Sequence, residues 1–173
     1  MMIRAFNDKH PSISPRAWVA ENATVAGDVT IGADTSIWYG AVLRGDAAPI
    51  RIGERTAIED NATLHENVTI GNDVIIGHNA IVHGCTIDDG ALIGMGATVL
   101  SGAHIGAGAM VAAGALVTQG VEVPAGWLFM GVPAIARGPL TEGQKASFAE
   151  SPAHYMEFAD GQLTRFGDVG ALD

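Results

Sequence analysis

Aliphatic residues recur at every sixth position along most of the chain. They fall in three runs: Ile13, Val19, Val25, Ile31, Ile37 and Leu43; then Ile52, Ile58, Leu64, Ile70, Ile76 and Val82; then Ile87, Ile93, Val99, Ile105, Val111, Val117 and Val123. A helix repeats every 3.6 residues and an amphipathic strand every 2, so neither explains a period of six. The alternative is a β-sandwich of alternating strands, but such a fold gives no reason for so many aliphatic residues to keep a spacing of six. The period instead indicates short extended stretches joined by tight corners.

Three such units form one triangular coil, in which strands one coil apart pair in parallel at a spacing of about 4.8 Å. Glycine often follows the aliphatic residue directly, and alanine often stands four positions after it. At the corners of the coil, glycine tolerates a positive φ. The sequence therefore predicts an all-β protein built on a parallel β-helix of hexapeptide repeats over residues 13–134. We expect residues 1–12 to form an N-terminal extension and residues 135–173 a C-terminal helical tail.

The tail carries signals for two short helical pieces within residues 141–160. Thr141 and Gln144 have the spacing of a capping box, and Ser151-Pro152 is typical of a second cap followed by a first helical turn. An apolar face is expected from Phe148, Tyr155, Met156 and Phe158. We expect this face to pack along the prism or on a neighbouring prism.

Composition narrows the classes of partner and compartment. The 173 residues carry a net charge of −10, which disfavours nucleic acid because an acidic surface repels phosphates. No apolar run approaches the roughly 20 residues that a membrane helix needs, and the N-terminus lacks the apolar core of a signal peptide. The single cysteine, Cys85, excludes an intrachain disulfide. The sequence therefore predicts a cytoplasmic, single-domain protein that binds neither membrane nor nucleic acid.

The histidines suggest a metal site when they are placed on the repeat. His65 follows Leu64 and His83 follows Val82, so the two are 18 residues apart, which is one coil. They should stack on one corner, where two imidazoles can share a metal ion. His78 lies on the preceding corner and could join them only across an interface, as a three-fold trimer would provide.

Other polar residues fall on the same corners of successive coils and so belong to the same vertical columns as the histidines. Arg44 occupies the position below His65, and Asp60 lies one coil below His78. Glu59 is close to both columns in sequence, and a pair of Arg44 with Asp46 could be bidentate and could cross the same interface.

The hexapeptide pattern resembles the left-handed parallel β-helix family, and this resemblance alone supplies the handedness. The motifs Arg44-Gly45-Asp46, Glu59-Asp60, Leu64-His65, Gly77-His78 and His83-Gly84-Cys85 resemble those of the gamma-class carbonic anhydrases in order and phase. The resemblance implies a homotrimer in which His65 and His83 of one subunit and His78 of the next bind Zn²⁺, with Fe²⁺ or Co²⁺ as alternatives.

The resemblance also implies roles for the surrounding residues. Arg44 and Asp46 correspond to an interface ion pair, and Glu59 stands where the family usually has a glutamine that orients the metal-bound solvent. Tyr155 resembles a tyrosine that the C-terminal helix brings near the site, and Asp60 would support the ligands. The implied reaction interconverts CO₂ and bicarbonate through a metal-bound hydroxide.

One departure from the family leaves two other functions open. The acidic loop that carries a proton-shuttle glutamate is absent, because His65-Glu66-Asn67 runs straight into the next repeat. Glu66 could take the place of the missing shuttle glutamate, and only its proximity to His65 recommends it. The alternatives are a hexapeptide acyltransferase that uses acyl-CoA and a metal-stabilised trimeric scaffold with little catalytic activity.

Overall fold

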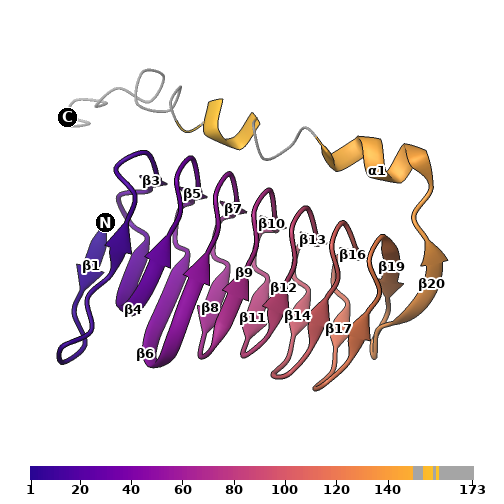
Figure 1. The fold of residues 1–173 in the computed structure, drawn as a ribbon, viewed down its shortest axis with the longest axis horizontal. Helices are drawn as coiled ribbons and strands as arrows, with labels where there is room; N and C mark the ends of the chain where they lie inside the picture. Colours follow the sequence, from indigo (N-terminus) through magenta and orange to yellow (C-terminus); the bar gives the residue numbers. More distant parts are fainter. Residues whose placement is uncertain (150–153, 158, 160–173) are drawn as a thin grey trace, which may run out of the picture.

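The computed structural model describes residues 1–149, 154–157 and 159 and shows a left-handed parallel β-helix (Figure 1). The predicted fold class is confirmed. The coils stack into a triangular prism, and each of its three faces is a ladder of short parallel strands. The long strands β4 and β6 turn a corner, so each contributes to two faces.

The first face, which carries the candidate site, contains β1 (Met2–Arg4), the first half of β4 (Thr24–Ile31), the first half of β6 (Val42–Ile52), β8 (Thr63–His65), β11 (Ile81–His83), β14 (Thr98–Val99) and β17 (Leu116–Val117). The second face contains β2 (Ser12–Ile13), the second halves of β4 and β6, β9 (Val68–Ile70), β12 (Thr86–Ile87), β15 (His104–Ile105) and β18 (Glu122–Val123).

The third face contains β3 (Trp18–Val19), β5 (Ser36–Ile37), β7 (Ala57–Ile58), β10 (Ile75–Ile76), β13 (Leu92–Ile93), β16 (Met110–Val111) and β19 (Trp127–Met130). It ends with β20 (Ile135–Pro139), which pairs antiparallel with β19. Within β6, the register with β4 shifts beyond Gly45, which accommodates the extra residues around Pro49 as a bulge.

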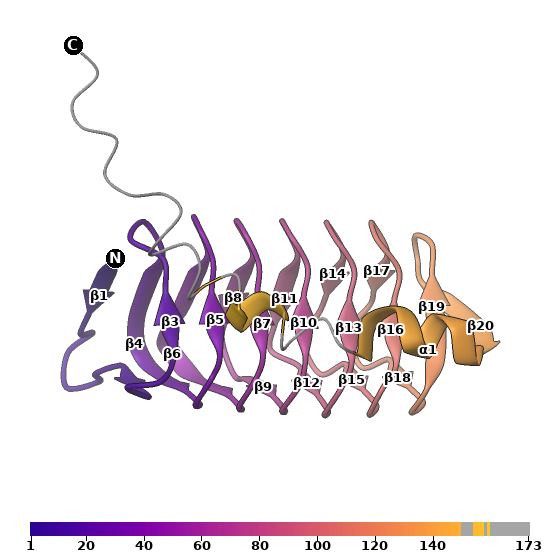
Figure 2. The same cartoon turned by 90° about the horizontal axis from the view of Figure 1, so that it is seen from above.

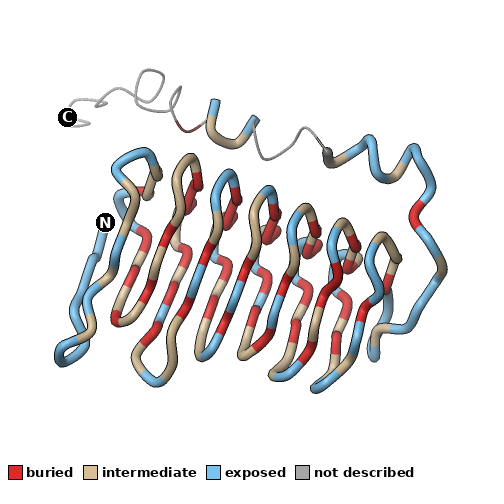
Figure 3. The backbone as a smooth tube through the Cα atoms, viewed as in Figure 1, coloured by how far each residue is buried: buried red, intermediate tan, exposed pale blue. Residues whose placement is uncertain are grey.

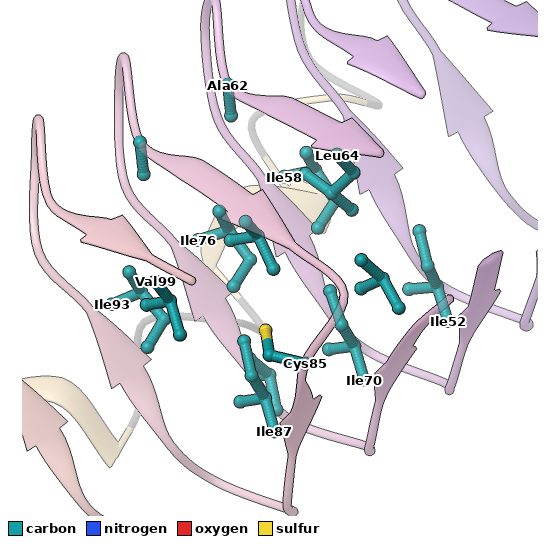
Figure 4. Packing of buried hydrophobic residues seen from close by; sticks show 14 of the residues in the cluster. Ile52, Ile58, Ala62, Leu64, Ile70, Ile76, Cys85, Ile87, Ile93 and Val99 are labelled. Atoms are coloured by element: carbon teal, nitrogen blue, oxygen red, sulfur yellow. The ribbon is translucent and has the colours of Figure 1, made fainter. Parts of the chain in front are cut away.

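The periodic aliphatic residues form the core of the prism (Figures 3 and 4). From Val25 to Val123 each of them is at most 4% exposed, and the alanines four positions later are equally buried. Ile13 and Val19 are only half-buried, because they belong to the N-terminal coil and have a neighbouring coil on one side only. The six-residue pattern therefore predicted which side chains point inward.

The C-terminal segment returns along the third face (Figure 2). Helix α1 (Glu142–Ala149) begins at the predicted capping box: the Thr141 amide donates to Gln144 Oε1 and the Gln144 amide donates to Thr141 Oγ1. Residues 154–157 are also helical, whereas Ser151-Pro152 and Phe158 lie outside the described residues. In the part of the chain that is described, no helix has the length and apolarity needed to span a membrane.

Candidate metal centre

His65 and His83 lie side by side on the first face, as the repeat predicted. They are direct partners in the register of β8 and β11, and their ring centroids are 5.2 Å apart. His65 Nδ1 lies 3.3 Å from His83 Nε2. Arg44 pairs with His65 in the register of β6 and β8, so the column Arg44, His65, His83 is confirmed.

The other nitrogen of each imidazole has its own partner. His65 Nε2 lies 3.0 Å from Asp46 Oδ1, and His83 Nδ1 lies 2.9 Å from Ser101 Oγ. Asp46 also accepts a hydrogen bond from Arg44 of the same chain on its other oxygen. Partial burial alone raises the pKa of Asp46, but hydrogen bonds from His65, Arg44 and backbone amides outweigh it and lower the pKa to about 2. The carboxylate that holds His65 is therefore ionised at neutral pH.

His78 occupies a different corner and contacts two carboxylates. Its Nε2 lies 3.1 Å from Glu59 Oε2 and its Nδ1 lies 2.9 Å from Asp60 Oδ2. The same Glu59 oxygen accepts a hydrogen bond from the His78 backbone amide. Among the described residues, the nitrogens of His78 do not join the group of ligand atoms around His65 and His83. One chain thus brings two of the three predicted ligands together and leaves the third apart.

Glu59 and Tyr155 connect the His78 corner to the C-terminal segment. Glu59 is only 2% exposed and hydrogen-bonds the Tyr155 hydroxyl. Burial, followed by that contact with Glu59, raises the pKa of Tyr155. The Tyr155 ring also packs edge-on against Trp38, with centroids 5.7 Å apart. Glu59, Tyr155 and Phe148 of α1 are among the residues that line a cavity of about 390 Å³.

The arrangement of His65 and His83 fits a tetrahedral metal ion. With bonds of about 2.0–2.1 Å, two nitrogens on such an ion stand about 3.3–3.4 Å apart, and the measured separation is 3.3 Å. A hydrogen bond donated by the distal nitrogen of His65 to the Asp46 carboxylate is the arrangement that usually fixes a metal-ligating histidine. Each ring therefore has one nitrogen held by Asp46 or Ser101, and the remaining nitrogens of the two rings lie 3.3 Å apart.

Three neighbours of the site were not predicted from the sequence in their observed roles. Ser101 contacts His83 from the next coil, which the 18-residue spacing could have indicated. Lys9 donates from Nζ to the Asp46 backbone carbonyl, and it lies outside the repeat. Glu66, predicted only by proximity, places Oε2 3.5 Å from His83 Nε2.

A family description, bacterial transferase hexapeptide (six repeats), matches residues 10–45, 49–84 and 84–119, well over half of the chain. The chain belongs to this hexapeptide family. A solved hexapeptide transferase family protein from Anaplasma phagocytophilum is 40% identical over 94% of this chain and 98% of that chain, with a TM-score of 0.91.

Within the hexapeptide family, relatives named carbonic anhydrase support the resemblance drawn from the motifs. The chain is 48% identical over 61 residues to a carbonic anhydrase of Geobacillus kaustophilus. It is 54% identical over 55 residues to gamma carbonic anhydrase 3, mitochondrial, of Arabidopsis thaliana. These matches span 35% and 32% of this chain, and 34% and 21% of the relatives' own lengths.

Proposed function

We propose that the protein is a metal-dependent hydratase of the gamma carbonic anhydrase kind, which interconverts CO₂ and bicarbonate at the interfaces of a homotrimer. The observation that carries the proposal is the 3.3 Å separation between His65 Nδ1 and His83 Nε2, with the outer nitrogens held by Asp46 and Ser101. Support comes from the similarity to proteins named carbonic anhydrase. Zn²⁺ is the expected ion, and Fe²⁺ or Co²⁺ suit the same ligands.

The third ligand would be His78 of the partner subunit. His78 is 36% exposed, so its ring is accessible at the corner of the prism. If Asp60 keeps its contact with Nδ1, Nε2 is the nitrogen that turns to the ion. Glu59, which lies 3.1 Å from that Nε2, is then brought beside the reacting centre.

The reaction would use a cation and fixed protein groups together. When bound, a divalent cation acts as a Lewis acid that allows a water molecule to ionise near neutral pH. Glu59 would accept the proton of that water or orient it, and the Tyr155 hydroxyl holds Glu59 in place. Arg44 and Asp46 would fix His65, and Asp60 would fix the partner's His78.

The shared site is tested by mixing two inactive variants. His65→Ala and His78→Ala are purified, metal-free chains are mixed at equal ratio and reassembled with Zn²⁺, and CO₂ hydration is followed by stopped flow. Random trimers restore an intact interface with a probability of about one quarter, so activity should return to about a quarter of that of the wild type. His104→Ala serves as the control and should keep its activity, because that histidine lies on the second face, away from the proposed site.

Recovery no greater than that of the separate variants would show that the histidines do not act across an interface. Metal analysis of the purified wild-type protein tests the ion directly. A trimer that binds one metal ion per chain but does not hydrate CO₂ would favour the scaffold function instead.

The second candidate is an acyltransferase that uses acyl-CoA. It is favoured by the family description and by the name of the Anaplasma protein, both of which refer to transferases. Coenzyme A should then raise the melting temperature, whereas a chelator should leave it unchanged. The hydratase proposal expects instead that coenzyme A leaves the melting temperature unchanged and that a chelator lowers it.

A further inference from the structure

Glu66 brings a carboxylate to the two stacked histidines from the same chain. Its Oε2 lies 3.5 Å from His83 Nε2, and single ligand atoms of His65, Glu66 and His83 all lie within 4.8 Å of one another. Two ligand atoms held about 2.0–2.2 Å from a tetrahedral ion stand about 3.3–3.5 Å apart. The separations of 3.3 Å between the imidazoles and 3.5 Å between Glu66 and His83 both correspond to this value.

The backbone at Glu66 is unusual for a residue with a side chain. Its φ is +60°, and the matching corner of each later coil on this column is glycine: Gly84 at +59°, Gly102 at +75° and Gly120 at +68°. The register of His65 with His83 establishes the correspondence of Glu66 with Gly84. On this column the coil that carries His65 therefore places a carboxylate where the later coils have glycine, as Asp73 does at another corner of the prism.

We propose that His65, Glu66 and His83 form a three-residue metal site within a single chain, which holds a divalent cation without His78 of the partner subunit. The inference rests on the proposed metal centre and extends it with a ligand. Two histidines and one glutamate are an established ligand set for zinc with an open fourth position. The side chain of Glu66 is 46% exposed, so it can approach the ion or give way to the partner's His78. The single-chain site can therefore hold the ion whether or not the interface has formed.

Co²⁺ titration of metal-free protein tests the single-chain site, with visible absorption reporting the ligands and metal analysis the stoichiometry. His78→Ala should still bind one Co²⁺ per chain. Adding Glu66→Gln to His78→Ala should weaken binding at least about tenfold, the loss seen when even a supporting group is removed. Adding Glu21→Gln to His78→Ala is the matched control and should leave the affinity unchanged, because Glu21 is an exposed glutamate elsewhere on the chain.

Glu66→Gly separates the ligand from the fold. Glycine is the residue found at this corner in the later coils, so this variant should unfold no more easily than wild type while losing the same metal affinity in the His78→Ala background. If His78→Ala binds no Co²⁺, or if removing Glu66 leaves its affinity unchanged, the single-chain site is wrong. Either result leaves the mixed-trimer assay unaffected, so the two proposals fail separately.

Discussion

Leu64 lies directly beneath the candidate site, and its truncation is the sharpest test of how the prism supports the histidines. The side chain is completely buried in the core of the prism (Figure 4), and the strand register stacks it between Leu43 of the preceding coil and Val82 of the next. Leu64→Ala removes three carbon atoms, whose transfer alone is worth about 2.4 kcal/mol at about 0.8 kcal/mol for each.

The cavity left at Leu64 should add to that transfer loss. Parallel ladders fix the coil spacing on both sides, so the walls cannot collapse freely into the space. The free energy of unfolding should therefore fall by about 3 kcal/mol, near the lower end of the range for buried leucines. For a chain of this size that corresponds to a drop of about 6–12 °C in melting temperature.

The measurement is urea unfolding at one protein concentration with chelator present, so that metal binding and assembly do not shift the stability. Leu116→Ala is the control: this leucine lies on the same face but points outward and is half-buried, so its loss should cost about 1 kcal/mol. Equal losses for the two variants would refute the assignment of Leu64 to the inner column. Hydrogen exchange should show the lost protection mainly in β6, β8 and β11, because coils interact chiefly with their neighbours.

Three further predictions concern the thiol, a surface histidine and a corner glycine. Cys85 is buried and its pKa is raised to about 12, so iodoacetamide at pH 8 should modify it only after denaturation; rapid labelling of folded protein would contradict this. His104, whose pKa is raised by hydrogen bonds to two carboxylates, should stabilise the fold below pH 6.5 and lose this contribution as pH rises through its folded pKa. The stability difference between wild type and His104→Asn should therefore shrink from pH 6 to pH 9. Gly84→Ala should cost more than Gly96→Ala, since both have a positive φ but only at Gly84 does a new Cβ meet a neighbour, 2.8 Å from Ser101 Oγ. Equal melting temperatures for the two variants would count against the steric argument.

The repeat predicted the frame of the site because inward residues and stacking follow from chain position alone. Once Leu64 and Val82 are assigned to the core, His65 and His83 must stand one above the other, and the structure places them so. The same arithmetic correctly placed Arg44 beside His65. The ligand roles of these residues stay predictions, because they concern an ion rather than the fold.

The contacts that the repeat did not predict depend on rotamers or on segments outside the coils. Lys9 reaches Asp46 because residues before the first full coil fold back, and no period describes them. Tyr155 reaches Trp38 through a tail whose path depends on packing along the third face. The contact of Glu66 with His83 depends on a left-handed backbone that the sequence does not reveal, since glutamate rarely adopts it.

Strand β20 limits how copies of the prism can associate. A stack of parallel coils could in principle grow end to end, because its last strand offers unpaired amides and carbonyls to any chain running the same way. On the third face that edge is occupied by β20, a strand of opposite direction that finishes in Pro139, which has no amide hydrogen to donate. The protein's own chain therefore blocks parallel growth of this one ladder, whereas the ladders of the first and second faces end in β17 and β18.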